Sequence, residues 1–130
     1  MKVMLDTNVC SSLIGKKNQP RIAWAVAHRP GELGISVITL CELEYGVANS
    51  SNPARNGQAL LMFLSPVEIA DYSSQIASVY GRVRFALKHA QIGPMDLLLA
   101  SHALTLDVEF ATDNIKEFGR VPGLKLAQMP

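Results

Sequence analysis

The chain has 130 residues, of which 48% are hydrophobic and 18% charged, with a net charge of +1. A chain of this length can bury a core of its own, and this composition excludes a disordered protein. The two cysteines, Cys10 and Cys41, form no metal-binding or redox pair, and no apolar run is long enough to span a bilayer. We therefore expect one cytoplasmic domain over residues 1–130, with no membrane association.

The first half of the chain alternates short apolar segments with segments of helical spacing. In chain order, the pattern predicts a strand at Val3–Leu5, helices at Thr7–Ile14 and Arg21–Val26, a strand at Leu33–Ser36 and a helix at Val37–Val47. Gly15 ends the first of these helices, and Ser36 is a suitable N-cap for the last.

The second half continues the same alternation. It predicts a helix at Ala54–Leu64, a strand at Val67–Ile69, a long amphipathic helix at Tyr72–Leu87, a helix at Met95–Leu104 behind Pro94, a strand at Val108–Ala111 and a candidate fifth strand at Leu124–Leu126. Strands that alternate with helices indicate an α/β domain. We expect a central, mostly parallel sheet of four to five short strands flanked by helices.

Four acidic residues fall where such a fold would gather them. Asp6 follows the first strand, Glu42 lies in the helix after the second, Asp96 lies in the first turn of a helix, and Asp113 follows the fourth strand. In an open α/β sheet the binding crevice lies beyond the carboxyl ends of the strands. The topology therefore predicts four carboxylates at one edge of the sheet.

Clustered carboxylates repel one another, and a hard divalent cation removes that repulsion. Mg²⁺ and Mn²⁺ prefer oxygen ligands, and a bound cation activates water and polarises phosphoryl oxygens. The arrangement suits metal-dependent phosphodiester hydrolysis. Three of the acids also have a purely structural interpretation: Asp6 as a helix N-cap, Asp96 as a favourable charge at a helix N-terminus, and Glu42 on an exposed helix face.

The acids lie in segments that resemble a known family. The segments are Leu5–Asn8, Ile35–Val47, Ile92–Asp96 and Ala111–Asn114, and they look like the PIN-domain nucleases. The following Glu117–Leu124 segment looks like the virulence-associated protein C toxins within that family. The resemblance runs from Lys2 to about Leu126, with the motifs in the family's order.

This resemblance implies a ribonuclease that uses Mg²⁺ or Mn²⁺ and acts as the toxin of a type II toxin–antitoxin pair. It also implies a homodimer bound by a small antitoxin. Carried over by position, Asp6, Glu42 and Asp96 match the family's first three acids, with Asp6 and Asp96 as holders of the principal cation. Glu42 is then a further ligand or the base for its water.

For the remaining positions of the family's motif, more than one residue of this sequence is a candidate. Thr7 or Asn8 corresponds to a polar position beside the first acid. For the fourth acid we choose Asp113, with Asn114 as a polar neighbour and Glu117 as a further candidate. The sequence thus leaves open which of the three completes the site, and whether one or two metals act.

Other functions were weighed against this one. A non-catalytic PIN-like binding module is the main alternative, and a phosphotransfer domain with Asp6 as nucleophile is a third. Basic residues that could meet an RNA backbone are Lys16, Lys17, Arg21, Arg82, Arg84, Lys88, Lys116 and Arg120, which could equally be solvated surface charges. Of the three histidines, only His102 is close enough in sequence to Asp96 to merit a test as an outer group of the site.

Overall fold

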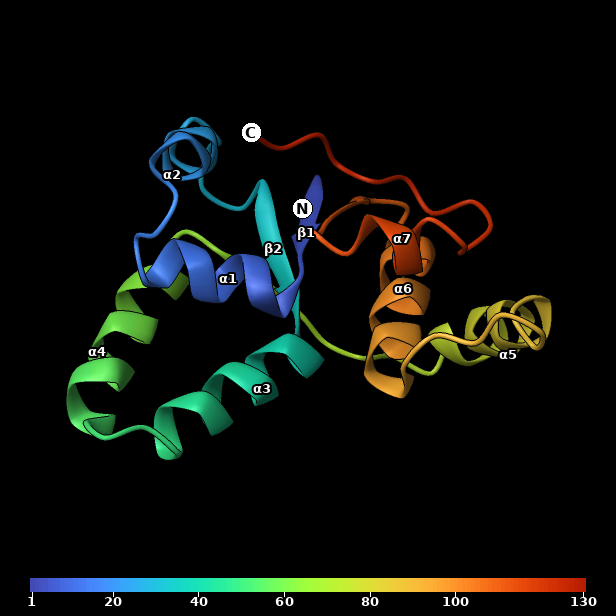
Figure 1. Ribbon diagram of the computed structural model, residues 1–130, viewed down its shortest axis with the longest axis horizontal. Helices are drawn as coiled ribbons and strands as arrows, with labels where there is room; N and C mark the ends of the chain where they lie inside the picture. The colour runs from blue at the N-terminus through green and yellow to red at the C-terminus, as the bar shows by residue number, and fades with distance from the viewer.

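The computed structural model describes all of residues 1–130 and contains a four-stranded parallel sheet with helices on both faces (Figure 1). The strands are β1 (Val3–Leu5), β2 (Leu33–Ser36), β3 (Glu68–Ala70) and β4 (Glu109–Ala111), and their order in the sheet is β3-β2-β1-β4. The helices are α1 (Thr7–Ile14), α2 (Gln19–Val26), α3 (Val37–Ala48), α4 (Pro53–Leu64), α5 (Ile76–Ala86), α6 (Pro94–Leu106) and α7 (Ile115–Phe118). The predicted α/β fold is confirmed.

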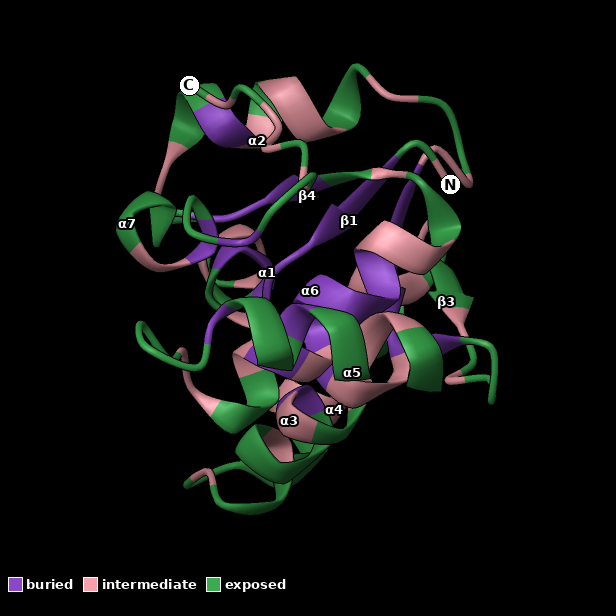
Figure 2. Cartoon of the chain, turned by 90° about the vertical axis from the view of Figure 1, so that its right-hand side faces the viewer, coloured by how far each residue is buried: buried purple, intermediate pink, exposed green.

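Alternate residues of β1 face opposite sides of the sheet, as the pleat of a strand requires. Val3 and Leu5 pack in a core with residues of α1, α3 and α4, whereas Met4 packs in a second core with residues of α5 and α6. All three are buried, so β1 is covered on both faces (Figure 2). Two apolar layers therefore fix the helices on either side of the strand that Asp6 follows.

Polar side chains start most of the helices. Asp6 caps α1, Ser36 caps α3, and asparagines at positions 18, 52 and 114 cap α2, α4 and α7. Each side chain accepts a hydrogen bond from a backbone N–H of the first turn, where the helix itself offers no partner. Asp6 and Ser36 are also the residues at which β1 and β2 turn into helices, so these caps set where α1 and α3 leave the sheet.

Three sequence predictions need correction. The helix expected from Tyr72 starts only at Ile76, because the Tyr72 hydroxyl donates to the carbonyl oxygen of Leu98 at 3.0 Å. The expected fifth strand is reduced to one parallel bridge between Phe110 and Leu126. The short helix α7 was not predicted. None of the seven helices combines the length and the hydropathy that a membrane span needs.

Candidate active site

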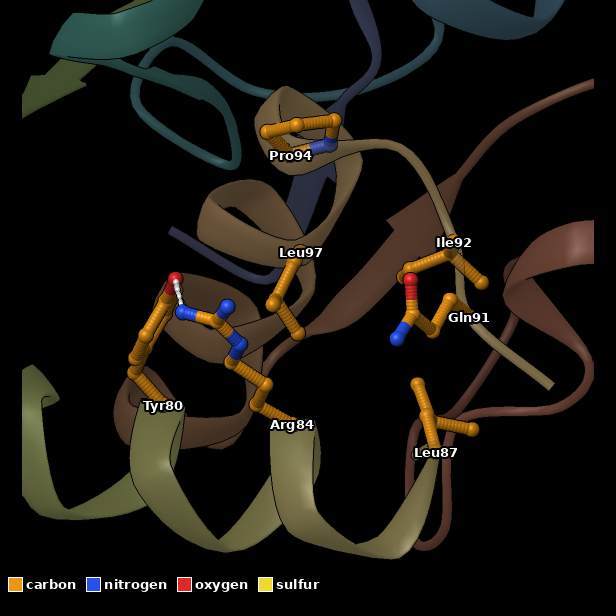
Figure 3. A pocket seen from close by; sticks show the side chains of 7 residues that line it. All are labelled: Tyr80, Arg84, Leu87, Gln91, Ile92, Pro94 and Leu97. Carbon is orange, nitrogen blue, oxygen red and sulfur yellow. Dashed lines mark hydrogen bonds between the residues drawn. The ribbon is translucent and has the colours of Figure 1, made fainter. Parts of the chain in front are cut away.

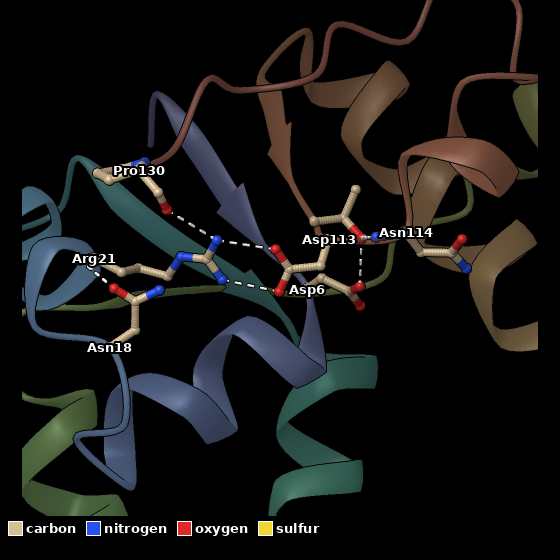
Figure 4. Close-up of polar contacts among 7 residues, drawn as sticks. Asp6, Asn18, Arg21, Asp113, Asn114 and Pro130 are labelled. Atoms are coloured by element: carbon tan, nitrogen blue, oxygen red, sulfur yellow. Dashed lines mark hydrogen bonds and ion pairs between the residues drawn. The ribbon is translucent and has the colours of Figure 1, made fainter.

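The strand order reverses between β1 and β4, which lie side by side in the sheet. The chain builds outward from β1 to β2 and β3, then crosses back to place β4 on the other side of β1. Such a reversal of strand order is the usual ligand-binding position in open parallel sheets. Asp6 follows β1, and Thr112 and Asp113 follow β4, so these residues meet at this reversal (Figure 4).

The Asp6 carboxylate is buried and held at both oxygens. Oδ1 accepts a hydrogen bond from the Thr7 N–H at 2.8 Å, and Oδ2 accepts one from the Thr112 hydroxyl at 2.8 Å. The Thr112 Oγ1 in turn accepts the Asn114 N–H at 3.0 Å. Burial raises the pKa of Asp6 above its usual value, although both hydrogen bonds oppose the rise. The structure thus fixes the orientation of a carboxylate whose charge is costly where it lies.

Glu117 is held as firmly as Asp6, although it is only half-buried. Its Oε1 accepts the Gly93 N–H at 2.6 Å, and its Oε2 accepts the Asn114 side-chain amide at 2.8 Å. The bond from Gly93 is the main reason why the pKa of Glu117 is below its usual value. Asn114 also caps α7, so this four-residue helix positions the carboxylate against the segment that precedes α6.

Asp96 is the residue that links the acids electrostatically. Burial raises the pKa of Asp96 to about 6, and the adjacent Glu117 carboxylate contributes the next largest part of the rise. The charges of Asp6 and Glu42 raise it further. Like charges raise a carboxyl pKa only at close range. We call Asp96 and the three carboxylates that act on it, Asp6, Glu42 and Glu117, the acid group.

Glu42 is the least constrained member of the acid group. Its Oε1 lies 3.5 Å from the Thr7 hydroxyl, and that hydroxyl lies 3.4 Å from the Thr39 hydroxyl. Thr7 therefore stands between Asp6, which its backbone N–H contacts, and Glu42, which its side chain contacts. Asn8, the other polar candidate from the sequence, is exposed on α1.

Asp113, our choice for the fourth acid, has a different partner. Both of its carboxylate oxygens accept hydrogen bonds from the guanidinium of Arg21, each at 2.9 Å (Figure 4). This pairing lowers the pKa of Asp113. The charge of Asp113 adds to the rise in the pKa of Asp6, but it is not among the charges that raise the pKa of Asp96. The structure groups Glu117, not Asp113, with Asp96. Asp113 was chosen from the sequence as the acid just past the fourth strand, and the sequence does not reveal that Arg21 approaches it.

The donor set suits a hard cation. The acid group supplies carboxylate oxygens only, which are the ligands that Mg²⁺ and Mn²⁺ prefer. The nearby Cys10 thiol offers no alternative, because burial and the Asp6 charge raise its pKa and keep it protonated. In this conformation no three His, Cys, Asp or Glu side chains lie close enough together to ligate one ion. Ligation by three of the acids would therefore require their side chains to turn toward one another.

His102 has a structural position rather than one among the acids. It is fully buried, and its Nδ1 lies 2.8 Å from the hydroxyl of Ser36, the residue that caps α3. The ring of Tyr72 packs edge-on against it, with centroids 4.9 Å apart. Burial lowers the pKa of His102, so the ring is held neutral. It connects α6, which carries Asp96, to the start of α3, which carries Glu42.

The fold and the site together define an α/β protein with a parallel sheet and an acidic site beside the reversal of its strand order. Comparison with known proteins identifies the family: the PIN domain matches residues 3–124, and the chain belongs to the PIN-domain family.

Relatives match the chain over nearly its whole length. "Ribonuclease VapC2" of Rickettsia felis is 40% identical and "tRNA(fMet)-specific endonuclease VapC" of Salmonella typhimurium is 38% identical, each over 97% of this chain and 96% of the relative. Among solved structures, DNA-bound VapBC from Salmonella typhimurium gives a TM-score of 0.90 at 36% identity, over 98% of this chain and 97% of that one. VapBC2 from Rickettsia felis, bound to a DNA fragment from the promoter, gives 0.88 at 38% identity over the full length of both chains.

Proposed function

We propose that this protein is a metal-dependent endoribonuclease and the toxin of a toxin–antitoxin pair. The observation that carries the proposal is the acid group itself: four carboxylates from distant parts of the chain, three of which add to the rise that burial causes in the pKa of Asp96. A fold gains no stability from bringing like charges together. Relatives that match this chain end to end are named as ribonucleases and a tRNA endonuclease, which supports the same activity.

Asp6 and Asp96 would hold the principal cation, Mg²⁺ or Mn²⁺, with Glu42 and Glu117 completing the acidic surroundings. Such a cation, when bound, supplies an activated water and polarises the phosphoryl oxygen. The chain itself holds the carboxylates in fixed positions. Asp96, whose pKa is about 6, must lose its proton before it can bind the cation. Thr112 and the Thr7 N–H fix Asp6, while the Gly93 N–H and Asn114 fix Glu117.

An antitoxin would bind on the helices beside the acid group. Two of the solved relatives are VapBC complexes on DNA, which supports a protein partner for this chain. Tyr45 of α3 and Leu61 and Met62 of α4 are large apolar side chains that are more than half exposed, and these helices lie together on the side of the sheet that α1 covers (Figure 1). A protein partner or a second copy of the chain would bury these exposed apolar side chains. We place this homodimeric, antitoxin-bound protein in the cytoplasm, where RNA is found.

The test is RNA cleavage by the purified chain, free of any partner, with Mg²⁺ or Mn²⁺. Mixed transfer RNA is the first substrate, and the controls are EDTA and Asp96→Asn. Cleavage that requires the metal and is lost in Asp96→Asn supports the proposal. If Asp96→Asn cuts as fast as the wild type, the acid group does not perform the reaction.

The alternative is a PIN-like module that binds without cutting. Isothermal titration with Mn²⁺ separates the two, because a binding module has no use for a cation at these residues. A folded wild-type protein that neither binds Mn²⁺ nor cuts RNA would establish the module instead.

A further inference from the structure

A second feature lies next to the acid group: a cavity of about 150 Å³ between α5 and the start of α6 (Figure 3). Leu87, directly after α5, and Leu97 of α6 are buried and form part of its wall. Ile92 of the connecting segment and Pro94 at the start of α6 also line it. An apolar wall of this extent can cover the faces of a flat, aromatic group and remove them from water.

The rest of the lining is polar, and most of it donates hydrogen bonds. Arg84 and Gln91 are exposed and line the cavity, and the Arg84 Nη1 donates to the Tyr80 hydroxyl at 3.3 Å. A Gln amide offers two donor hydrogens and an acceptor oxygen, and a guanidinium offers donors in a fixed plane. No acidic residue lines the cavity. Its chemistry therefore suits a planar group whose edge carries both acceptors and donors.

The cavity and the acid group share one segment of chain. Ile92 and Pro94 line the cavity, and Gly93 stands between them. A Cβ added to Gly93 would lie 3.6 Å from the Asp96 Oδ2 and 3.7 Å from the Glu117 Oε1. A phosphate placed at the carboxylates, with its cation, would therefore have a neighbouring nucleotide at the mouth of the cavity.

Positively charged side chains lie beside the segment that the cavity and the acid group share. Arg84 lines the cavity, Lys88 follows one turn later on the chain, and the Arg120 Nη1 approaches the carbonyl oxygen of Gln91 at 3.4 Å. Cations next to an otherwise acidic site attract the phosphates of a nucleic acid backbone. Sequence-specific recognition of RNA usually targets unpaired bases, which are stacked and hydrogen-bonded in this manner.

We propose that this cavity binds one unpaired base of an RNA strand, next to the phosphodiester at the acid group, and that Gln91 and Arg84 recognise the edge of that base. The inference rests on the proposed function for its substrate class, and it adds a residue-level basis for substrate choice. An apolar side chain of a protein partner would fill the same wall but would have no use for the Gln91 amide.

The test measures binding rather than cleavage, in the Asp96→Asn background so that the strand stays intact. Fluorescence anisotropy compares oligo(A), oligo(C) and oligo(U) with an abasic ribose–phosphate strand of the same length. We expect the best of the three base-bearing strands to bind about ten-fold more tightly than the abasic strand, as loss of a stacked base predicts. We call this difference in affinity between base-bearing and abasic strands the gap. Adding Gln91→Ala or Arg84→Ala should remove most of the gap, and Gln91→Ala should leave the affinity for the abasic strand unchanged.

Arg82→Ala is the matched control, because Arg82 is exposed on the same helix but does not line the cavity. It should keep the gap between base-bearing and abasic strands. Equal binding of all four strands to Asp96→Asn, or an undiminished gap in Gln91→Ala, overturns the proposal. So does a change of oligomeric state in Gln91→Ala without a change in the gap, since the cavity is then a protein contact.

Failure of the proposed function would look different. Wild-type protein is assayed in parallel for cleavage of transfer RNA with Mn²⁺. No cleavage together with a base-dependent gap in binding would reject the nuclease and retain the base-binding cavity. Cleavage without such a gap would retain the nuclease and reject the cavity.

Discussion

Arg21 of α2 and Asp113 after β4 form a two-point ion pair across 92 positions of sequence (Figure 4). The Arg21 side chain is only 10% exposed, whereas that of Asp113 is 60% exposed. Asp113 directly follows Thr112, whose hydroxyl holds Asp6. The pair therefore ties α2 to the turn that orients the most buried carboxylate of the acid group, without belonging to that group.

Breaking this pair should lower stability. Arg21→Ala removes a nearly buried, bidentate partner, and we expect the free energy of unfolding to fall by about 1–3 kcal/mol, the range for hydrogen bonds to charged groups. Asp113→Asn, which keeps one acceptor oxygen, should cost less. Urea denaturation measures both. The exposed pair Lys125–Asp107, at 3.5 Å, is the control, and Lys125→Ala should change stability by less than about 1 kcal/mol. Equal costs for Arg21→Ala and Lys125→Ala would contradict the importance of the buried guanidinium.

The structure predicts opposite outcomes at the two candidates for the fourth acid. Glu117→Gln removes a charge that acts directly on Asp96, and we expect cleavage to fall by about 100-fold with a matching loss of Mn²⁺ affinity. Asp113→Asn should leave the rate within about three-fold, because Asp113 is paired with Arg21 and its charge does not act on Asp96. Single-turnover cleavage with titration of Mn²⁺ measures both variants. A greater loss in Asp113→Asn would restore the assignment made from the sequence.

The acid group should make the metal-free protein less stable as the pH rises. The folded-state pKa of Asp96 is about 6, above its ordinary 3.8, so folded protein retains a proton that unfolded protein has lost. The contribution of Asp96 to stability is therefore present below pH 4 and falls as the pH rises toward 6. Melting temperatures in EDTA between pH 4 and pH 7 should show this decline, and Asp96→Asn should weaken it.

Added Mn²⁺ should reverse the effect at neutral pH. A cation that binds only the folded protein raises the melting temperature, and Asp96→Asn should abolish most of that rise. The affinity for Mn²⁺ should drop about ten-fold from pH 7 to pH 5, because protons then compete for Asp96. A melting temperature that does not respond to Mn²⁺ at pH 7 would argue against cation binding at these residues.

Thr112 offers a test of orientation without a change of charge. Thr112→Val keeps the shape of the side chain but removes the hydroxyl that donates to Asp6, and the rate of cleavage should fall about ten-fold. Thr105→Val is the matched control, since the Thr105 hydroxyl donates to the carbonyl oxygen of Ser101 on α6. Circular dichroism should show both variants folded. Equal rates in the two variants would mean that the Thr112 hydroxyl does not position Asp6.

Much of this architecture was predictable because its signals are local. Apolar triplets such as Val3–Leu5 and caps such as Ser36 are recognisable from a few consecutive residues. The structure confirms both the strand and the cap. The parallel sheet then follows from the alternation of strands and helices. Helix α7 was missed because it has only four residues and is stabilised mainly by its Asn114 cap. Tyr72 was misplaced because its hydrogen bond is to a residue of another helix.

The site was harder to predict because its distinctions depend on tertiary contacts. The topology indicates that acids gather at one sheet edge, but Asp113 and Glu117 both lie near that edge in sequence. Only the fold brings Arg21 to Asp113 and the Gly93 N–H to Glu117. The cavity beside Gly93 is equally invisible in the sequence, because its walls come from two helices and the segment between them.

The order β3-β2-β1-β4 has a consequence for synthesis of the chain. The first strand to leave the ribosome, β1, is a central strand, and its partner on one side is β4, which is made last. Asp6 therefore cannot contact Thr112, and Asp96 cannot approach Glu117, until nearly the whole chain has emerged. A nascent chain has no complete acid group, and the group is assembled only when the final segment folds.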